Sequence, residues 1–576
     1  MSDVFVGGPK APKDPTKKQP GFYIMRNKEI VAMPQPDGRG MCPIYESDGR
    51  LLSAAGLVGN IKDNEIIELL KTTEGFRKLV SKIGVCIEEE NTSDICHFVF
   101  QMYGKKDLYG GGANIRLDVK TDGMEYLADL NDVEWREDDD VPGQIRFEFD
   151  KAGAKANVSV KLYLNDGFTA PEPEEEYPVD FESEDYKKII EKSLFYKGNN
   201  ARIKRALCKA RSGEQTTVAF LGGSITQGAG AVPINTECYA YKTFEGFCKI
   251  AGKGTDENIQ YIKAGVGGTP SEYGMLRYRR DILDECVGEG PDLVVVEFAV
   301  NDEGDETKGE CFDSLIRKIY EGPGKPAVII EFAVFANDWN LQDRLKPVGY
   351  AYEIPMASAF DSVVDQFKLI FGEGRVLSKS QYFYDMFHPT NIGHRIMADG
   401  IINLIKKADE AEADEPIDSL ADIAAPMGKE FENVELLDRQ VNNCGAIIAE
   451  GDFDKTDDVI QCVERNMDMA VTPQLPYNWM YRGSEQVGGR PFTMDVECSA
   501  LLLIFKDSAD NKDGKAKVYV DGEYVLTADP RLVGWTHCDP VIILRGAKKQ
   551  KHHVEVVMEE DQTNRDFTIL GFGVVQ

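Results

Sequence analysis

The hydrophobic pattern changes twice along the chain, and these changes predict its domains. From residue 21 to residue 164, segments such as ANIRLDVKTDG and QIRFEFDKAG alternate apolar with polar positions and end at Asp-Gly or Gly turns. This period of two is typical of strands with one buried face. A segment with helical periodicity, residues 63–84, interrupts the strands. We therefore expect a flexible tail over residues 1–20 and a strand-rich, sandwich-like domain over residues 21–180.

The middle of the chain, residues 181–410, has a different pattern. Strand-length apolar runs such as LVVVEFAV (293–300) alternate with helix-like segments such as YAYKTFEGFCKIAG (239–252). Strands that alternate with helices predict a parallel sheet covered on both faces, and strands at its centre are apolar throughout. In such sheets, ligands bind at the carboxyl ends of the strands. Candidate functional residues are therefore those that follow the strands.

The strand pattern returns after the acidic stretch ADEAEADEP. Within residues 411–576, KVYVDGEYVLTAD consists of two alternating runs joined by Asp-Gly, which indicates a hairpin. We expect an accessory β-sandwich in this region. The predicted architecture is an α/β domain flanked by N- and C-terminal β-sandwich-like domains.

Charge and composition exclude several classes of protein. Lys and Arg number 66 against 98 Asp and Glu, which gives a formal net charge of −32. Such a surface repels nucleic acids and anionic membranes, so we expect neither as a partner. The first twenty residues lack an apolar signal-peptide core, and the apolar runs are too short to span a membrane, so we expect a cytoplasmic protein. The twelve cysteines include no CxxC pair, and no zinc or redox motif is expected.

The glycine-rich sequence LGGSITQG (221–228) follows the first apolar strand of the α/β segment. A phosphate-binding loop would need a Lys-Ser/Thr pair or a GxGxxG fingerprint, and this loop has neither. The loop also does not match the G-x-S-x-G nucleophile elbow of α/β-hydrolases, because Thr226 stands at the position of the last glycine in that motif. Two interpretations of the loop alone stay open: a turn capped by a serine, and a turn that presents Ser224 as a nucleophile.

A serine nucleophile needs an imidazole base and a carboxylate that orients the imidazole. Of the six histidines in the chain, His388 and His394 fall in the α/β segment, within YDMFHPTNIGH. Asp385 precedes His388 by three residues, so one loop can hold both side chains. His394 lies on the predicted following helix, where we expect a structural role.

Donors that stabilise an oxyanion are expected at the same edge of the sheet. KAGVGGTPSEYG (263–274) places two adjacent glycines after the second strand, where backbone N–H groups can approach a ligand. FAVND ends the third long strand, so Asn301 offers a carboxamide there. The ends of three strands and the loop that carries Asp385 and His388 are therefore expected to meet at the same edge of the sheet.

These segments resemble, in order, the four blocks of the SGNH (GDSL-like) hydrolase family, over roughly residues 185–408. GGSITQG is similar to the first block, although Gly223 stands where the family usually has aspartate. AGVGGTPSEYG is similar to the second block. AVND is similar to the third, with Ala299 in place of the customary glycine, and DMFHP is similar to the last.

The resemblance implies a flavodoxin-like, doubly wound parallel sheet and hydrolysis of an ester through an acyl-enzyme. Ser224 would be the nucleophile, His388 the general base and Asp385 the carboxylate that orients it. The N–H groups of Ser224 and Gly268 and the side-chain amide of Asn301 would form the oxyanion hole. No metal ion and no cofactor is required.

The flanking strand-rich segments resemble the accessory domains of carbohydrate-active esterases. We therefore expect an acetylesterase that acts on acetylated oligosaccharides from plant polysaccharides of the xylan or mannan type. The aromatic residues expected to contact sugar rings are Trp339, Tyr477, Trp479 and Tyr481. For the last three, burial in a sandwich core is the competing interpretation.

Two other functions stay open. One is a general short-chain carboxylesterase or lipase of the same family. The other is a non-catalytic carbohydrate-binding protein on a hydrolase scaffold, which the intact set of Ser, Asn, Asp and His residues disfavours.

Overall fold

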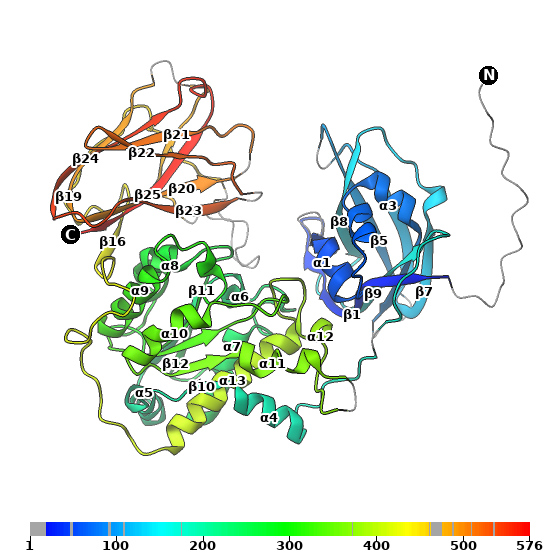
Figure 1. The fold of residues 1–576 in the computed structure, drawn as a ribbon, viewed down its shortest axis with the longest axis horizontal. Coiled ribbons are helices and arrows are strands. Elements are labelled where there is room, and N and C mark those ends of the chain that lie inside the picture. The colour runs from blue at the N-terminus through cyan, green and yellow to red at the C-terminus, as the bar shows by residue number, and fades with distance from the viewer. Residues whose placement is uncertain are drawn as a thin grey trace, which may run out of the picture. The chain divides into compact units, whose positions relative to one another are not determined.

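The computed structural model describes residues 19–576 apart from the segments 46–49, 90–93, 108–109, 174, 371–372, 460, 462–474, 486–488, 509 and 534–535. Residues 1–18 of the predicted tail thus lie outside the described residues. The chain divides into two compact units, Met1–Glu175 and Glu176–Gln576, and each is described by itself (Figure 1). Among the described residues, no helix combines the length and the apolarity needed to cross a membrane.

The first unit consists mainly of two antiparallel sheets that share one core. One sheet has the strand order β1-β9-β4-β7 and the other β2-β3-β8-β5-β6. Phe22 and Val160 of the first sheet belong to the same buried cluster as Phe98 and Phe147 of the second. The strands are β1 (Gly21–Val31), β2 (Met33–Pro34), β3 (Gly40–Tyr45), β4 (Val80–Glu88), β5 (Ile95–Gly104), β6 (Asn114–Lys120), β7 (Asp122–Asp129), β8 (Asp139–Phe149) and β9 (Lys155–Leu164).

The helical part of this unit differs from the single segment predicted over residues 63–84, which was wrong in its length. The helices are α1 (Arg50–Leu57), α2 (Asn64–Leu70) and α3 (Thr73–Leu79). Extended backbone at Thr72 separates α2 from α3, and its hydroxyl accepts a hydrogen bond from the Gly75 N–H as an N-cap. Residues 80–88 form β4 because they pair with both β7 and β9, and this tertiary pairing overrides the helical pattern.

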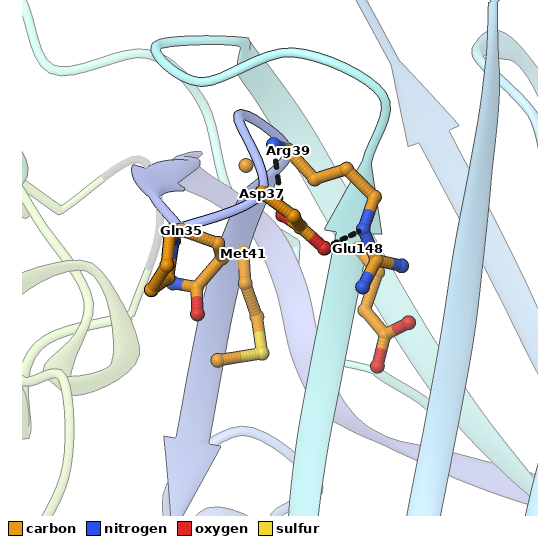
Figure 2. Close-up of a pocket in the computed structure, with 7 residues that line it drawn as sticks. Gln35, Asp37, Arg39, Met41 and Glu148 are labelled. Carbon is orange, nitrogen blue, oxygen red and sulfur yellow. Dashed lines mark hydrogen bonds and ion pairs between the residues drawn. The ribbon is translucent and has the colours of Figure 1, made fainter.

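A tight turn joins β2 to β3 and borders a small cavity of about 190 Å³ (Figure 2). Asp37 accepts hydrogen bonds from the N–H and the Nε of Arg39, while Gly38 has the positive φ of 86° that the turn requires. Both side chains of this ion pair are more than half exposed. Such a pair adds little stability, and we regard the cavity as a feature of the turn.

The second unit contains a six-stranded sheet with the order β10-β15-β14-β13-β11-β12. Its strands are β10 (Leu194–Tyr196), β11 (Thr216–Gly222), β12 (Ile259–Gly265), β13 (Leu293–Glu297), β14 (Ala327–Phe332) and β15 (Met356–Ser358). All neighbours are parallel except β10, which runs antiparallel to β15 at the edge. Because β11 lies between β12 and β13, the carboxyl ends of these three strands are adjacent.

Helices cover both faces of this sheet. Ala219 and Leu221 of β11 belong to the core that includes α8, α9 and α10, whereas Phe220 faces the other way and contacts Tyr239 of α7. The helices are α4 (Glu184–Lys192), α5 (Ala201–Ser212), α6 (Ser224–Gln227), α7 (Tyr239–Ala251), α8 (Ser271–Tyr278), α9 (Glu310–Glu321), α10 (Gln342–Ala351), α11 (Ala359–Val363), α12 (Lys379–Tyr382) and α13 (Asn391–Glu410). This is the α/β arrangement that the alternating pattern predicts.

Two further antiparallel sheets follow α13. One has the order β16-β25-β20-β23, with β18 also paired to β25, and the other has the order β17-β19-β24-β21-β22. The strands are β16 (Val434–Leu437), β17 (Ile447–Ala449), β18 (Trp479–Tyr481), β19 (Phe492–Cys498), β20 (Ala500–Asp507), β21 (Ala516–Val520), β22 (Glu523–Ala528), β23 (His537–Leu544), β24 (Gln550–Met558) and β25 (Phe567–Val575).

The first of these sheets packs directly on the α/β part of the unit. Leu501 and Leu503 of β20 enter the core between the two sheets, while Leu502 enters the core that includes α8. Gly573 of β25 lies so close to α8 that a Cβ atom there would come within 2.5 Å of Leu276. This double burial explains why β20 and β25 are apolar along nearly their whole length.

This shared core makes a prediction for Leu502→Ala. Loss of a fully buried leucine is expected to lower the free energy of unfolding by about 2–5 kcal/mol. Hydrogen exchange, measured by mass spectrometry, should become faster in β20 and in α8 together, whereas faster exchange in β20 alone would contradict the shared core. Ile447→Ala, which alters a side chain that is 68% exposed, is the control and should change neither region.

Candidate active site

Ser224 lies at the sharp turn between β11, an internal strand of the sheet, and the short helix α6. The strand ends at Gly222, and the helix begins at Ser224 itself. The two glycines before the serine are required by their neighbours. A Cβ atom at Gly222 would come within 2.1 Å of the Thr226 hydroxyl, and one at Gly223 within 2.0 Å of the Asn301 carboxamide oxygen. The turn therefore holds Ser224 at the carboxyl edge of the sheet.

The loop between α12 and α13 brings an imidazole to this serine. His388 Nε2 lies 2.9 Å from Ser224 Oγ, although 164 residues separate the two in the sequence. The other ring nitrogen, Nδ1, lies 3.0 and 2.9 Å from the carboxylate oxygens of Asp385. With Nδ1–H donating to the carboxylate, Nε2 is left to accept the hydroxyl proton of Ser224.

Asp385 is fixed by its own loop. Its Oδ1 accepts hydrogen bonds of 2.8 Å from the backbone N–H groups of Phe387 and His388. The loop is closed by the Tyr384 N–H, which donates to the His388 carbonyl, and Thr390 caps the start of α13. Asp385 and His388 are 3% and 7% exposed, so the pair is shielded from bulk water and strongly oriented.

Besides Ser224, two of the three predicted oxyanion residues follow the strands on either side of β11. Gly268 lies in the loop after β12 and has a left-handed backbone with φ of 70°, which suits glycine. Asn301 lies after β13, and its carboxamide is packed against Gly223, one residue before the serine. The Asn301 oxygen is buried and has no hydrogen-bond partner in the described part of the chain. The adjacent Nδ2 is the donor of this amide.

The buried carboxyl group of Asp302 connects the loop after β13 to the start of α8. Asp302 accepts hydrogen bonds of 2.7 Å from the Ser271 N–H and 2.9 Å from the Ser271 hydroxyl. Burial, together with the neighbouring Asp305, raises the pKa of Asp302 to about 8. This side chain supports the loop that carries Asn301.

Arg277 is a positioning residue for the strand ends that carry the site. Its guanidinium is 1% exposed and donates 2.8 Å hydrogen bonds to the carbonyl oxygens of Gly222 and Ala264, at the ends of β11 and β12. It also pairs with Asp281 at 3.1 Å. The arginine thus binds the carbonyl that immediately precedes the nucleophile turn. No motif signals this role, because the contacts are to backbone oxygens.

His394 has a structural environment. Its Nδ1 accepts a hydrogen bond from the Tyr239 N–H, and its Nε2 lies 3.0 Å from the carbonyl of Ala229. Burial lowers the pKa of this imidazole to about 3, so it is neutral at physiological pH. The ring therefore connects α13 to α7 and to the loop after α6.

The four aromatic residues predicted to contact sugar lie in different surroundings. Trp479 and Tyr481 are each 1% exposed and belong to the core between the two C-terminal sheets, so neither ring is accessible for stacking on a sugar. Tyr477 is 44% exposed and precedes β18. The structure does not bring these three residues together with Ser224. The competing interpretation, a buried sandwich aromatic, describes Trp479 and Tyr481.

Trp339 belongs to a row of aromatic rings that leads to the imidazole. Its ring lies 5.8 Å from that of Phe335, which lies 5.1 Å from that of Phe387. Phe387 is 45% exposed and lies beside His388, with ring centroids 6.2 Å apart. Sequence reasoning missed Phe387, although its position next to the histidine in DMFHP was a usable signal.

Two side-chain groups among the described residues have the spacing to hold a metal ion. One comprises Glu272, Asp305 and Cys311, and the other Asp507, His537 and Asp539. In the first, Glu272 of α8 already accepts a hydrogen bond from the Glu306 N–H, and Asp305 accepts hydrogen bonds from the Thr307 and Gly309 N–H groups of its own loop. Neither group includes Ser224, Asp385 or His388.

Comparison with known proteins identifies the class of this domain. Residues 220–396 match the GDSL-like Lipase/Acylhydrolase family. A solved structure of a two-domain esterase (CEX) active on acetylated mannans is 25% identical, with a TM-score of 0.56, and the match covers 67% of this chain and 99% of that one. A second structure of that esterase, co-crystallised with mannopentaose, is 24% identical over 69% and 99% of the two chains, also with a TM-score of 0.56. No curated protein sequence matches.

The chain therefore contains a GDSL-like lipase/acylhydrolase domain, which confirms the family resemblance of the four sequence blocks. The reaction class of this domain is hydrolysis of carboxylic esters.

The contact between Gly223 and Asn301 makes a prediction for Gly223→Ala. The added methyl group would occupy the space of the Asn301 carboxamide and displace this donor. We expect kcat on p-nitrophenyl acetate to fall by about tenfold or more, towards the loss typical of a missing oxyanion donor, with little change in KM. An unchanged kcat would show that Asn301 does not act in the transition state. Gly288→Ala, where a Cβ has ample space, is the control.

Proposed function

We propose that this protein is a serine esterase that removes acetyl groups from plant-polysaccharide oligosaccharides, with mannan-type chains as the first candidates. The observation that carries the proposal is the hydrogen-bonded series Ser224–His388–Asp385. The solved esterase active on acetylated mannans supports the substrate class. The net charge of −32 also favours a neutral glycan over an anionic substrate.

The proposed reaction has two halves. In the first, Ser224 Oγ attacks the acetyl carbonyl while His388 Nε2 takes the hydroxyl proton, and Asp385 stabilises the imidazolium. The proton then passes to the departing sugar oxygen as the ester bond breaks, which leaves an acetyl-enzyme. In the second, His388 activates a water molecule that releases acetate and restores the serine.

Hydrogen-bond donors stabilise the negative charge that develops on the carbonyl oxygen. We assign this role to the N–H groups of Ser224 and Gly268 and to the side-chain amide of Asn301. Gly268 and Asn301 follow β12 and β13, the strands on both sides of β11, so the donors approach the serine from two directions. Each such donor is typically worth about 2.7–4 kcal/mol in the transition state.

The domain organisation forms part of the proposal. We interpret residues 21–180 and 411–576 as accessory β-sandwich-like domains that flank the hydrolase domain, residues 181–410. The two-domain esterase is matched over 99% of its length by 67% of this chain, so a third of this chain has no counterpart in it. This proportion is consistent with an additional domain such as the first unit.

The central test is acetate release by the wild type and by Ser224→Ala. We expect kcat on acetylated mannan oligosaccharides to fall by more than about a thousandfold, since nucleophile loss removes the acyl-enzyme route. Acetylated xylan oligosaccharides, p-nitrophenyl acetate and p-nitrophenyl octanoate complete the panel. Ser212→Ala, at the end of α5, is the control and should retain full activity.

The same panel separates the alternatives. Serine-dependent activity on aryl esters without release from either glycan would indicate a general carboxylesterase or lipase. No hydrolysis of any ester would indicate the non-catalytic binding protein.

The exposed ring of Phe387 makes a prediction about sugar binding. Phe387→Ala should raise KM for acetylated mannan oligosaccharides about two- to tenfold, because an aromatic contact beside His388 is lost, while kinetics on p-nitrophenyl acetate change little. An equal effect on both substrates would contradict a sugar contact. Tyr524→Ala removes a ring that is 56% exposed on β22 and serves as the matched control.

A further inference from the structure

Two glutamate side chains lie at the same edge of the sheet as the nucleophile turn. Glu297 is the last residue of β13, and Glu331 belongs to the neighbouring parallel strand β14. Val296 is in register with Ile330, so the next residue along each strand places Glu297 beside Glu331 on one face of the sheet. The residues are 0% and 1% exposed, respectively. Neither takes part in the proposed reaction.

The surroundings of these carboxyl groups contain acids and phenols. Asp302 and the phenols of Tyr239 and Tyr382 interact electrostatically with one or both of them. In the described part of the chain, no lysine, arginine or histidine makes a resolved interaction with either carboxyl. Two neighbouring carboxylates without a cation would be strongly unfavourable in a buried site.

The neutral form of both groups follows from this environment. Burial raises the pKa of Glu331 to about 8, and burial together with Glu331 and Asp302 raises that of Glu297 well above its ordinary value. Both Glu331 oxygens and Oε1 of Glu297 lack a partner of hydrogen-bond geometry within the described residues, and the Ala359 N–H that faces Glu331 offsets only part of the effect of burial on its pKa. A neutral acid carries its own O–H donor, which suits a pair of adjacent carboxyl groups.

One member of the pair is connected to the nucleophile helix. The Thr226 hydroxyl donates to Glu297 Oε2 at 3.2 Å, and the backbone N–H of Gly223 also faces this carboxyl. Gly223 and Thr226 stand on either side of Ser224 in the sequence. The Thr226 hydroxyl is also 2.8 Å from the Tyr239 hydroxyl. Glu297 therefore contacts the turn before and after the serine.

We infer that Glu297 and Glu331 are positioning residues that hold the nucleophile turn as a pair of neutral carboxylic acids. Glu297 accepts the hydrogen bond of Thr226, and burial beside Glu331 disfavours a charge on either carboxyl group. Loss of the proton of Glu331 at alkaline pH places a charge beside Glu297, disturbs the turn and lowers kcat. This inference rests on the proposed function in that Ser224 is taken as the nucleophile.

The first experiment compares the pH dependence of kcat for the wild type and Glu331→Gln, on p-nitrophenyl acetate between pH 6 and 10. The Ser224→Ala protein gives the background at each pH. Wild-type kcat should decline as the pH rises through about 8, while Glu331→Gln keeps at least half of the kcat at pH 7 and declines about one pH unit later or not at all. Superimposable alkaline declines would overturn the inference. Glu497→Gln, an exposed position on β19, should match the wild type.

The second experiment distinguishes a positioning role from a charge requirement. Glu297→Gln keeps a neutral acceptor for Thr226 and should retain kcat within about twofold, whereas Glu297→Ala and Thr226→Val should each lower it about three- to tenfold with KM unchanged. The double variant Glu297→Ala/Thr226→Val should be no worse than the poorer of the two single variants, because both substitutions remove the hydrogen bond between Thr226 and Glu297. Equal losses in Glu297→Gln and Glu297→Ala would overturn the neutral pair.

A third measurement does not depend on activity. The folded protein keeps the Glu331 proton up to a pH of about 8, whereas the unfolded chain releases it near the ordinary value of 4.5. Stability from this group therefore falls as the pH rises from about 4.5 to about 8. The thermal midpoint of Glu331→Gln should decline less than that of the wild type across this window, and parallel curves would overturn the inference. This outcome can be read even if the protein hydrolyses no ester.

Discussion

The hydrogen bond between His388 Nε2 and Ser224 Oγ is the interaction on which the whole site depends, because it joins the turn after β11 to a loop 164 residues later in the sequence. Its geometry requires a turn with no side chains at Gly222 and Gly223, since Thr226 and Asn301 occupy that space. It also requires a histidine loop with its own internal support, which Asp385 provides through three donors. Each partner is thus held in place before any substrate arrives.

The wider fold fixes the strand ends that carry these groups. Arg277 binds the carbonyls that end β11 and β12, and Asp302 ties the Asn301 loop to the start of α8. On its outer side α8 packs against β20 and β25, so the first C-terminal sheet shares a core with the helix that supports the site. Support for the site therefore extends from the strand ends into the first C-terminal sheet. The proposed neutral pair of Glu297 and Glu331 adds a further support through the contacts of Glu297 with Thr226 and Gly223.

The features of the fold that depend on a local sequence pattern could be predicted from the sequence. The alternation of apolar strands with helices predicts the six-stranded sheet. The motifs around Ser224, Asn301 and His388 predict that these residues lie at the carboxyl edge of that sheet. Features set by tertiary contact were not predictable. The segment 63–84 has helical periodicity throughout, yet its end becomes β4 through pairing with two strands. Trp479 and Tyr481 are aromatic residues of the type that stacks on sugar rings. They are buried because the two C-terminal sheets pack around them, and a short sequence motif does not reveal this packing. Gly223 departs from the family pattern, and the packed carboxamide of Asn301 explains it.

The most direct test of the central claim is covalent labelling of the full-length protein with an organophosphate ester that mimics the tetrahedral intermediate. Intact-protein mass spectrometry should find one adduct per chain, and peptide mapping should locate it on Ser224. Labelling should be abolished in Ser224→Ala and slowed by orders of magnitude in His388→Ala, because the hydroxyl loses its base. An adduct on another residue, or labelling that is equally fast without His388, would contradict a Ser224–His388–Asp385 esterase.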